Sequence, residues 1–181
     1  MKISYNSPVI LTYAIIAIAA LAFCSKTLMI QLCTSPSRLA LDDPGFYLRL
    51  FTYIAGHAGW QHLYGNLIMI LLVGPLLEEK YGSGKILEMI LVTAVATAIL
   101  NVVLFSTAIM GGSGIAFMLI LLSSFVNFRA REIPLTFLII AALFMGGEIM
   151  AGLRPDHISQ FSHMAGGAVG AGYGFLRSRK A

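Results

Sequence analysis

Charged residues are scarce in this sequence. Only 11% of its 181 residues are Asp, Glu, Lys or Arg and 58% are hydrophobic, whereas about a quarter of a soluble domain is charged. The basic residues that give the net charge of +4 are scattered at the ends of apolar runs, so they form no stripe that could follow a nucleic-acid backbone. Because each helical crossing needs about 20 apolar residues, we expect one membrane domain over residues 1–181, with about six spans and no separate soluble domain.

Cysteines and metal-binding motifs are also few. Cys24 and Cys33 are nine residues apart with no histidine nearby, which predicts no metal site and leaves open whether they form a disulfide. The metalloprotease motif His-Glu-x-x-His does not occur. The three aspartates, Asp42, Asp43 and Asp156, fall in expected loops, which excludes an aspartyl intramembrane protease because that class needs two membrane-embedded carboxylates. We expect no metal and no cofactor.

The apolar runs predict an all-α polytopic membrane protein with six spans. These cover about residues 8–29, 62–77, 86–105, 115–126, 135–151 and 158–176. The fourth has only 12 residues, and at about 1.5 Å per residue it is too short for a hydrocarbon core of about 30 Å. It is therefore expected to begin inside the membrane, where non-helical backbone is tolerated only if it is buried or lines a wet cavity.

Two segments near the N-terminus allow alternative interpretations. Lys2 and the apolar run that follows could be a signal peptide, but the bulky Phe23 before Cys24 disfavours cleavage there, so a first membrane span is the preferred interpretation. Residues 31–59 are half polar and rich in aromatic side chains. They are expected to form a structured element lying in the membrane interface, with an ordinary extramembrane loop as the alternative.

The distribution of basic residues predicts the topology. With six spans, eight Lys and Arg residues lie on the side of the two termini and four on the other side, so both termini are expected to be cytoplasmic. The loops before the second, fourth and sixth spans then share the outer side. Three polar motifs that are distant in the sequence are therefore expected to lie at the same depth in the membrane.

These motifs carry chemistry suited to acyl transfer. Ser113 lies between glycines at the start of the short span, and a histidine is the usual base for activating a serine at neutral pH. His163 is followed by Gly166 and Gly170 on one helical face, and we expect this small-residue face to pack against the helix that begins at Ser113. No carboxylate is well placed as a third member, so a Ser-His dyad is the simpler hypothesis.

A second pair of polar residues is expected near the outer end of the second span. His62 and Asn66 are separated by four residues and so share one helical face. Polar side chains that point into a membrane bundle are costly unless they are paired or functional. Donors aimed at a developing oxyanion are such a function.

Together, the three motifs resemble the rhomboid family of intramembrane serine proteases. The family pattern Gly-x-Ser-Gly matches residues 111–114, His-x-x-Gly-x-x-x-Gly matches 163–170, and His-x-x-x-Asn matches 62–66. The resemblance implies a six-helix rhomboid-like bundle, and a Ser113–His163 dyad with Asn66, His62 and the Ser113 amide as oxyanion hole. Further supporting residues implied by the family pattern are Gly111, Gly112, Gly114, Gly166, Gly170, His57 in the first loop, and Phe117 as the aromatic that packs on the catalytic histidine.

The resemblance also implies the substrates, which are expected to be single-span membrane proteins cut in contact with membrane lipids. The compact size fits an enzyme of a bacterial inner membrane, and the distribution of Lys and Arg predicts that its site opens outward. The oligomeric state stays open. A non-proteolytic member of the same fold that binds and escorts membrane helices is the main alternative, and a channel or transporter is disfavoured because no internal repeat occurs.

Overall fold

The computed structural model describes residues 6–129 and 157–178, together with Leu135, Leu138, Ile139, Ala142, Leu143, Gly146 and Gly147. Every element in this part is helical, which confirms the all-α prediction. The helices are α1 (Pro8–Phe23), α2 (Lys26–Leu32), α3 (Pro44–Thr52), the short 3-10 helix η1 (Tyr53–Ala55), α4 (Trp60–Tyr81), α5 (Ser83–Leu104), α6 (Ser113–Arg129) and α8 (His157–Ser178). Most of the predicted fifth span, 135–151, and the turn at 154–156 lie outside the described residues.

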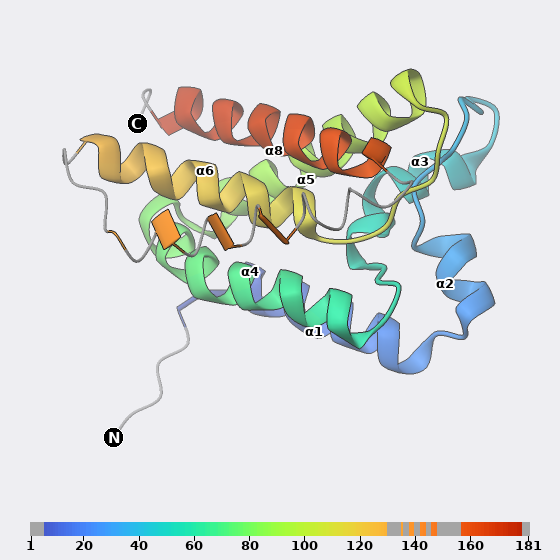
Figure 1. The fold of residues 1–181 in the computed structure, drawn as a ribbon, viewed down its shortest axis with the longest axis horizontal. Coiled ribbons are helices and arrows are strands. Elements are labelled where there is room, and N and C mark those ends of the chain that lie inside the picture. Colours follow the sequence, from blue (N-terminus) through green and yellow to red (C-terminus); the bar gives the residue numbers. More distant parts are fainter. Residues whose placement is uncertain are drawn as a thin grey trace.

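The long helices lie side by side and alternate in direction. Figure 1 shows α1 and α5 running one way along the bundle and α4, α6 and α8 running the other way. The α4–α5 turn and the C-terminal ends of α6 and α8 therefore meet at one end. The first loop with α2 and α3, the loop before α6 and the start of α8 meet at the opposite end, where Ser113 begins its helix.

The first predicted span is shorter than expected. The helix α1 ends at Phe23, and α2 starts at Lys26 as a separate element, so the prediction of one helix over 8–29 is wrong. Ser25 explains the break because its side chain accepts a hydrogen bond from the backbone N–H of Leu28, which makes it the N-cap of α2. Cys24 and Cys33 flank this region, and both are free thiols.

The helix that follows the glycine motif begins at Ser113, as the sequence predicts. It extends over 17 residues to Arg129, about 25 Å at the usual helical rise. The apolar run of 12 residues is the central part of this helix, and the whole helix is still shorter than a full hydrocarbon core. Two described helices, α4 and α5, are long and apolar enough to cross a membrane, and α1 and Ser113–Ser124 are shorter apolar segments.

The segment between α2 and α4 is structured, as the sequence predicts. In α3, Phe46 and Leu50 are buried, whereas Tyr47 and Leu48 on the other face are exposed. The buried face belongs to a small core with Tyr53 and with Ala94 and Ala98 of α5, tied by a hydrogen bond from the Tyr53 hydroxyl to the Ala94 carbonyl. The first loop is thus anchored on the bundle.

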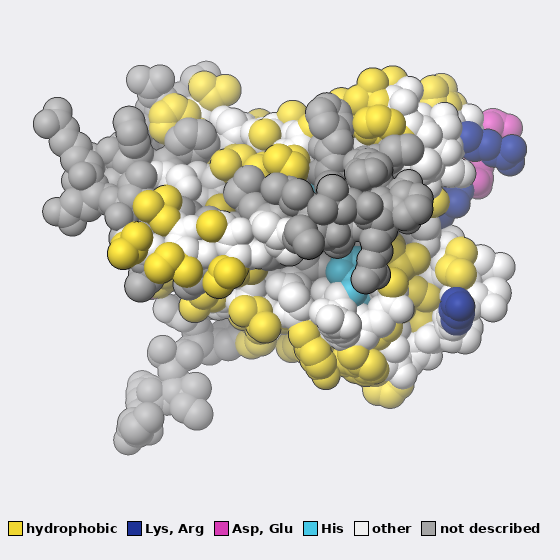
Figure 2. Space-filling model, in the orientation of Figure 1, with side chains coloured by type: hydrophobic (Ala, Val, Ile, Leu, Met, Phe, Trp, Pro, Cys, Tyr) yellow, Lys and Arg dark blue, Asp and Glu magenta, His cyan; other side chains and the backbone are white. Residues whose placement is uncertain are grey.

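The outer surface of the bundle is apolar. In the view of Figure 2, hydrophobic side chains cover much of the described surface, and the charged side chains gather at the end that carries α2 and α3. Among the exposed large apolar side chains, Ile15, Ile68 and Leu76 are 57%, 64% and 70% accessible. Such a surface is unfavourable in water and suits lipid, so it agrees with the membrane class that the composition predicts.

Candidate active site

The structure brings Ser113 and His163 into contact. Ser113 is the first residue of α6 and is 2% exposed, and His163 lies in the second turn of α8 and is 5% exposed. The Ser113 hydroxyl is hydrogen-bonded to Nδ1 of His163. Because Ser113 starts a helix, its hydroxyl lies at the positive end of the helix dipole, which favours developing negative charge there.

Close packing explains why glycines precede the serine. Gly111 has a φ angle of +130°, which side chains other than glycine rarely adopt, and a β-carbon there would lie 2.9 Å from Nε2 of His62. At Gly112 a β-carbon would overlap the hydroxyl of Tyr13, whose O–H donates to the Ile54 carbonyl at 2.7 Å. Gly114 is less constrained, since its β-carbon would come within 3.3 Å of Thr97 Oγ1.

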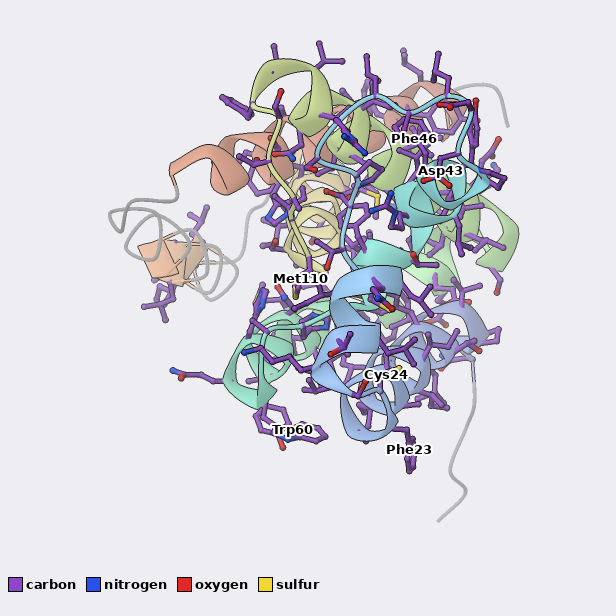
Figure 3. All side chains as sticks on the ribbon, turned by 90° about the vertical axis from the view of Figure 1, so that its right-hand side faces the viewer. Phe23, Cys24, Asp43, Phe46, Trp60 and Met110 are labelled. Carbon is purple, nitrogen blue, oxygen red and sulfur yellow. The ribbon has the colours of Figure 1, made fainter. Side chains whose placement is uncertain are left out.

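Two distant segments hold the loop before α6. The Gly111 amide donates to the Tyr53 carbonyl at 3.0 Å. Ser35 and Ile109 exchange two bonds, one from the Ser35 amide to the Ile109 carbonyl at 2.8 Å and one from the Ile109 amide to the Ser35 hydroxyl at 3.0 Å. Figure 3 looks onto this end of the bundle, where Met110 marks the loop. The position of Ser113 is thus set by the first loop as well as by its own helix.

His62 and Asn66 face the same loop from α4. Asn66 is 1% exposed, and its Nδ2 would lie 3.6 Å from a β-carbon at Gly111. This amide nitrogen has no hydrogen-bond partner among the described residues. Nδ1 of His62 accepts from the Ala58 amide at 3.5 Å, so in the neutral ring the proton is on Nε2, the atom that faces Gly111. Two donors therefore converge beside the glycines that precede Ser113.

His57 lies behind this pair. Its ring contacts the His62 ring edge to face, with centroids 5.0 Å apart, and its Nδ1 is 3.2 Å from the Ala55 carbonyl. Burial, and then the neighbouring His62, lower the pKa of His57 to about 4, against the opposing effect of the Ala55 hydrogen bond. His57 is therefore neutral at pH 7, and its uncharged ring packs on the ring of His62.

The glycine face of α8 packs only partly as predicted. Gly166 and Gly170 face Thr97 and Thr93 of α5, because a β-carbon at either glycine would overlap the threonine hydroxyl opposite it. Gly167, four residues after His163, faces α6, where a β-carbon would meet the Gly114 carbonyl at 2.8 Å. The predicted contact with α6 is found at Gly170, whose β-carbon would also lie 3.3 Å from Met118 Cγ of α6, but not at Gly166. At 100° per residue, Gly170 points within about 20° of His163 and Gly166 about 60° away, so Gly166 is turned toward α5.

Phe117 also differs from its expected place. Its ring edge lies 2.8 Å from the position of a β-carbon on Gly167, and the side chain is 8% exposed. Among the described residues, one ring-to-ring contact involves a histidine, and it joins His57 and His62. Phe117 therefore fills the α6–α8 interface below His163 and does not stack on the imidazole.

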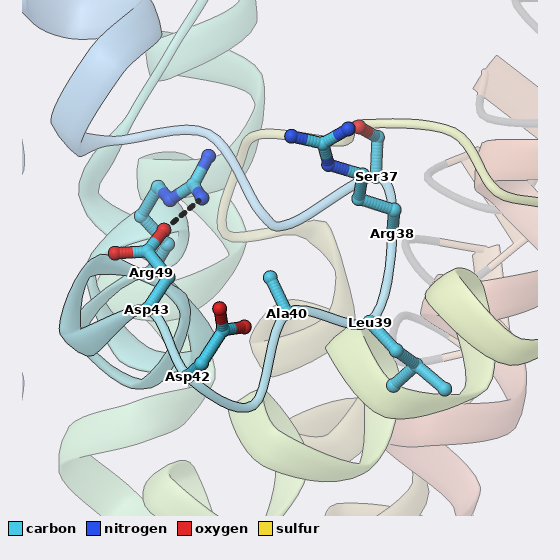
Figure 4. A pocket seen from close by; sticks show the side chains of 7 residues that line it. All are labelled: Ser37, Arg38, Leu39, Ala40, Asp42, Asp43 and Arg49. Atoms are coloured by element: carbon cyan, nitrogen blue, oxygen red, sulfur yellow. Dashed lines mark ion pairs between the residues drawn. The ribbon is translucent and has the colours of Figure 1, made fainter.

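A separate polar cavity lies in the first loop. It has a volume of about 790 Å³ and is lined by Ser37, Arg38, Leu39, Ala40, Asp42, Asp43 and Arg49 (Figure 4). Nη2 of Arg49 lies 3.5 Å from Oδ2 of Asp43, and the two side chains are 29% and 49% exposed. An ion pair with this exposure contributes little to stability. None of the predicted site residues lines this cavity.

Comparison with known proteins gives the family. Residues 44–180 match the model of the Rhomboid domain. Rhomboid-related protein 1 of Caenorhabditis elegans is 26% identical over an alignment of 139 positions, and the match covers 71% of this chain and 39% of that protein. The chain spans 39% of the length of this curated relative. The chain belongs to the rhomboid family, and it is an integral membrane protein.

Several supporting residues were missed by reasoning from the sequence. The Tyr13 hydroxyl packs against Gly112 and donates to the Ile54 carbonyl, and the Tyr53 carbonyl accepts from the Gly111 amide. Asn101 connects the loop before α6 to α8 through bonds to Thr107 and Ser162. The sequence did contain a signal for Asn101, because polar residues repeat every four positions, at Thr93, Thr97 and Asn101, in an otherwise apolar helix. Such a polar stripe in a membrane helix must face the protein interior.

Proposed function

We propose that this chain is an intramembrane serine endopeptidase that cleaves single-span membrane proteins. The observation that carries the proposal is the hydrogen bond between Ser113 and His163, which joins two buried side chains 50 residues apart. Membership of the rhomboid family supports this chemistry.

Each residue then has a defined task. The Ser113 oxygen attacks the carbonyl carbon of the scissile peptide while its proton passes to Nδ1 of His163. The imidazolium returns this proton to the leaving amine as the carbon–nitrogen bond breaks. Water then attacks the acyl-enzyme with His163 again acting as base, which releases the second product and restores Ser113.

The oxyanion would be stabilised by three donors. These are the backbone N–H of Ser113, Nδ2 of Asn66 and Nε2 of His62. A buried amide nitrogen without a partner costs about 1–3 kcal/mol, so the unpartnered Nδ2 of Asn66 supports a functional role. It needs no reorganisation when negative charge develops beside it.

The proposal includes the topology of the chain. Residues 1–181 form one membrane domain of six spans with both termini in the cytoplasm and the dyad near the outer side. The alternating directions of the described helices support this arrangement because Lys80, Lys85 and the C-terminal ends of α6 and α8 share one end. The dyad lies toward the opposite end, with the first loop.

Cleavage of a single-span model substrate in liposomes tests the proposal. We expect wild-type protein to cleave and both Ser113→Ala and His163→Ala to lose activity by at least about 10³-fold. The control is Ser124→Ala, because Ser124 lies on the same helix and its hydroxyl, among the residues that the structure describes, donates only to the Ile120 carbonyl of that helix. If folded wild-type protein binds membrane helices without cutting them, the escort function replaces the protease function.

A further inference from the structure

Asn101 joins three segments through one buried side chain. It is fully buried near the C-terminal end of α5. Its Oδ1 accepts from the Ser162 hydroxyl at 3.0 Å and from the Thr107 hydroxyl at 3.3 Å, and its Nδ2 donates to the Thr107 carbonyl at 2.6 Å. Thr107 belongs to the loop that leads into Ser113, and Ser162 is the residue before His163.

The Ser162 bond fixes the rotation of α8. Consecutive residues of an α-helix point about 100° apart, so Ser162 faces α5 while His163 faces the start of α6. Any rotation of α8 about its axis that moves the imidazole away from Ser113 also breaks the bond to Asn101. The Asn101 side chain also bonds to Thr107. One side chain of α5 therefore contacts both the loop that leads into Ser113 and the helix that carries His163.

The Ser162 bond differs from the contacts next to it along the α5–α8 interface. A second side-chain hydrogen bond, from the Tyr173 hydroxyl to Glu88, joins the two helices near their other ends, away from His163. The next two levels of the interface pair Thr97 with Gly166 and Thr93 with Gly170, and both are filled by close contact of a threonine with a glycine. The Thr93 hydroxyl has no hydrogen-bond partner among the described residues. At these two levels α5 and α8 are held by close packing, whereas beside His163 they are held by the hydrogen bond between Asn101 and Ser162.

We propose that Asn101 is a positioning residue that keeps His163 in hydrogen-bonding register with Ser113 through Ser162, and keeps the Ser113 loop in place through Thr107. The inference rests on the proposed protease function for its kinetic consequences. The geometric part concerns the orientation of the imidazole and is independent of whether the chain cleaves a substrate.

Ser162→Ala is the most selective variant because it removes one hydroxyl and leaves both Thr107 bonds in place. We expect kcat to fall about tenfold with KM and the midpoint of thermal unfolding unchanged, since misplacing a base lowers the rate without altering substrate binding. Asn101→Ala should cost at least as much. In the double variant, Ser162→Ala should lower kcat less than it does in wild-type protein, because Asn101→Ala has already removed the bond that the two residues share.

Thr93→Val is the matched control. It changes a buried threonine on the same face of α5, keeps the side-chain volume and removes a hydroxyl that has no partner. We expect it to keep wild-type kcat. An equal loss of kcat in Thr93→Val would overturn the proposal, because general packing of α5 on α8 would then explain the Ser162 effect.

A measurement on the imidazole separates this inference from the protease function. In 15N-histidine-labelled protein, which has four histidines, the Nδ1 signal of His163 is assigned by its loss in His163→Ala. We expect it to shift in Ser162→Ala toward the value of an imidazole without a hydrogen bond, and to stay unchanged in Thr93→Val. An unchanged signal in Ser162→Ala overturns the positioning role, even if wild-type protein proves not to be a protease. If Asn101→Ala does not fold, Ser162→Ala alone gives this result.

Discussion

Thr97 of α5 fills the space beside Gly166 of α8, so that a β-carbon at position 166 would overlap the threonine hydroxyl and lie 2.7 Å from the Thr97 Cα. Gly166→Ala should therefore force α8 away from α5 and destabilise the protein by about 1–3 kcal/mol, as overpacking usually does. Activity should fall as well, because His163 lies on the same helix. Thermal unfolding in detergent measures the first effect. Gly172→Ala is the control, since nothing lies within 4 Å of its β-carbon, and an equally stable Gly166→Ala would contradict the packing described.

Glu78 at the C-terminal part of α4 caps the N-terminus of α1. It is 1% exposed, and its two carboxylate oxygens accept from the amides of Val9 and Ile10, each at 2.9 Å. Glu78→Ala should cost about 2 kcal/mol of unfolding free energy, because it leaves one buried and one partly buried N–H group without a partner. The neighbouring Glu79 is exposed, so Glu79→Ala should leave the unfolding midpoint unchanged. Equal effects of the two substitutions would show that the cap does not stabilise the helix pair.

His57 should make the protein less stable in acid. Its pKa of about 4 in the folded protein lies below the ordinary value of 6.5. Between these values the unfolded chain binds a proton that the folded chain does not, so stability is complete above pH 6.5 and is lost as the pH falls toward 4. His57→Asn keeps a nitrogen donor near the Ala55 carbonyl but cannot titrate. The unfolding free energy of this variant should fall less between pH 6.5 and 4.5 than that of wild type, and parallel pH curves would contradict the assignment.

Asn66 should act on catalysis more than on stability. If its amide donates to the oxyanion, Asn66→Ala should lower kcat on the order of 10²-fold, about 3 kcal/mol, with little change in KM. The unfolding midpoint should be nearly unchanged, since Nδ2 has no partner to lose in the described protein. His62→Ala should be milder because Asn66 and the Ser113 amide would remain. Wild-type kcat in a folded Asn66→Ala variant would remove this residue from the site.

The sequence predicts the helical class and the residues that meet, but not how some of them meet. Composition and apolar runs place α4, α5 and α8 to within a few residues, because membrane helices must satisfy their backbone internally. The helix break at Ser25 could not be predicted from hydropathy, because the N-cap depends on a single side chain within an apolar run. The pairing of Gly166 with Thr97 could not be predicted either, because small residues show that a helix approaches another closely without showing which one. The buried bonds of Asn101 depend on the same tertiary detail.

Labelling of Ser113 by a serine-reactive phosphonate tests the central claim most directly. The probe reports the activated hydroxyl itself and needs no knowledge of the natural substrate. We predict that folded wild-type protein is modified at Ser113 and that His163→Ala lowers the labelling rate by at least about 10³-fold while the protein remains folded. Other serines, such as Ser124, should stay unmodified. Modification of Ser113 at the same rate in His163→Ala, or no modification of folded wild-type protein, would contradict the dyad.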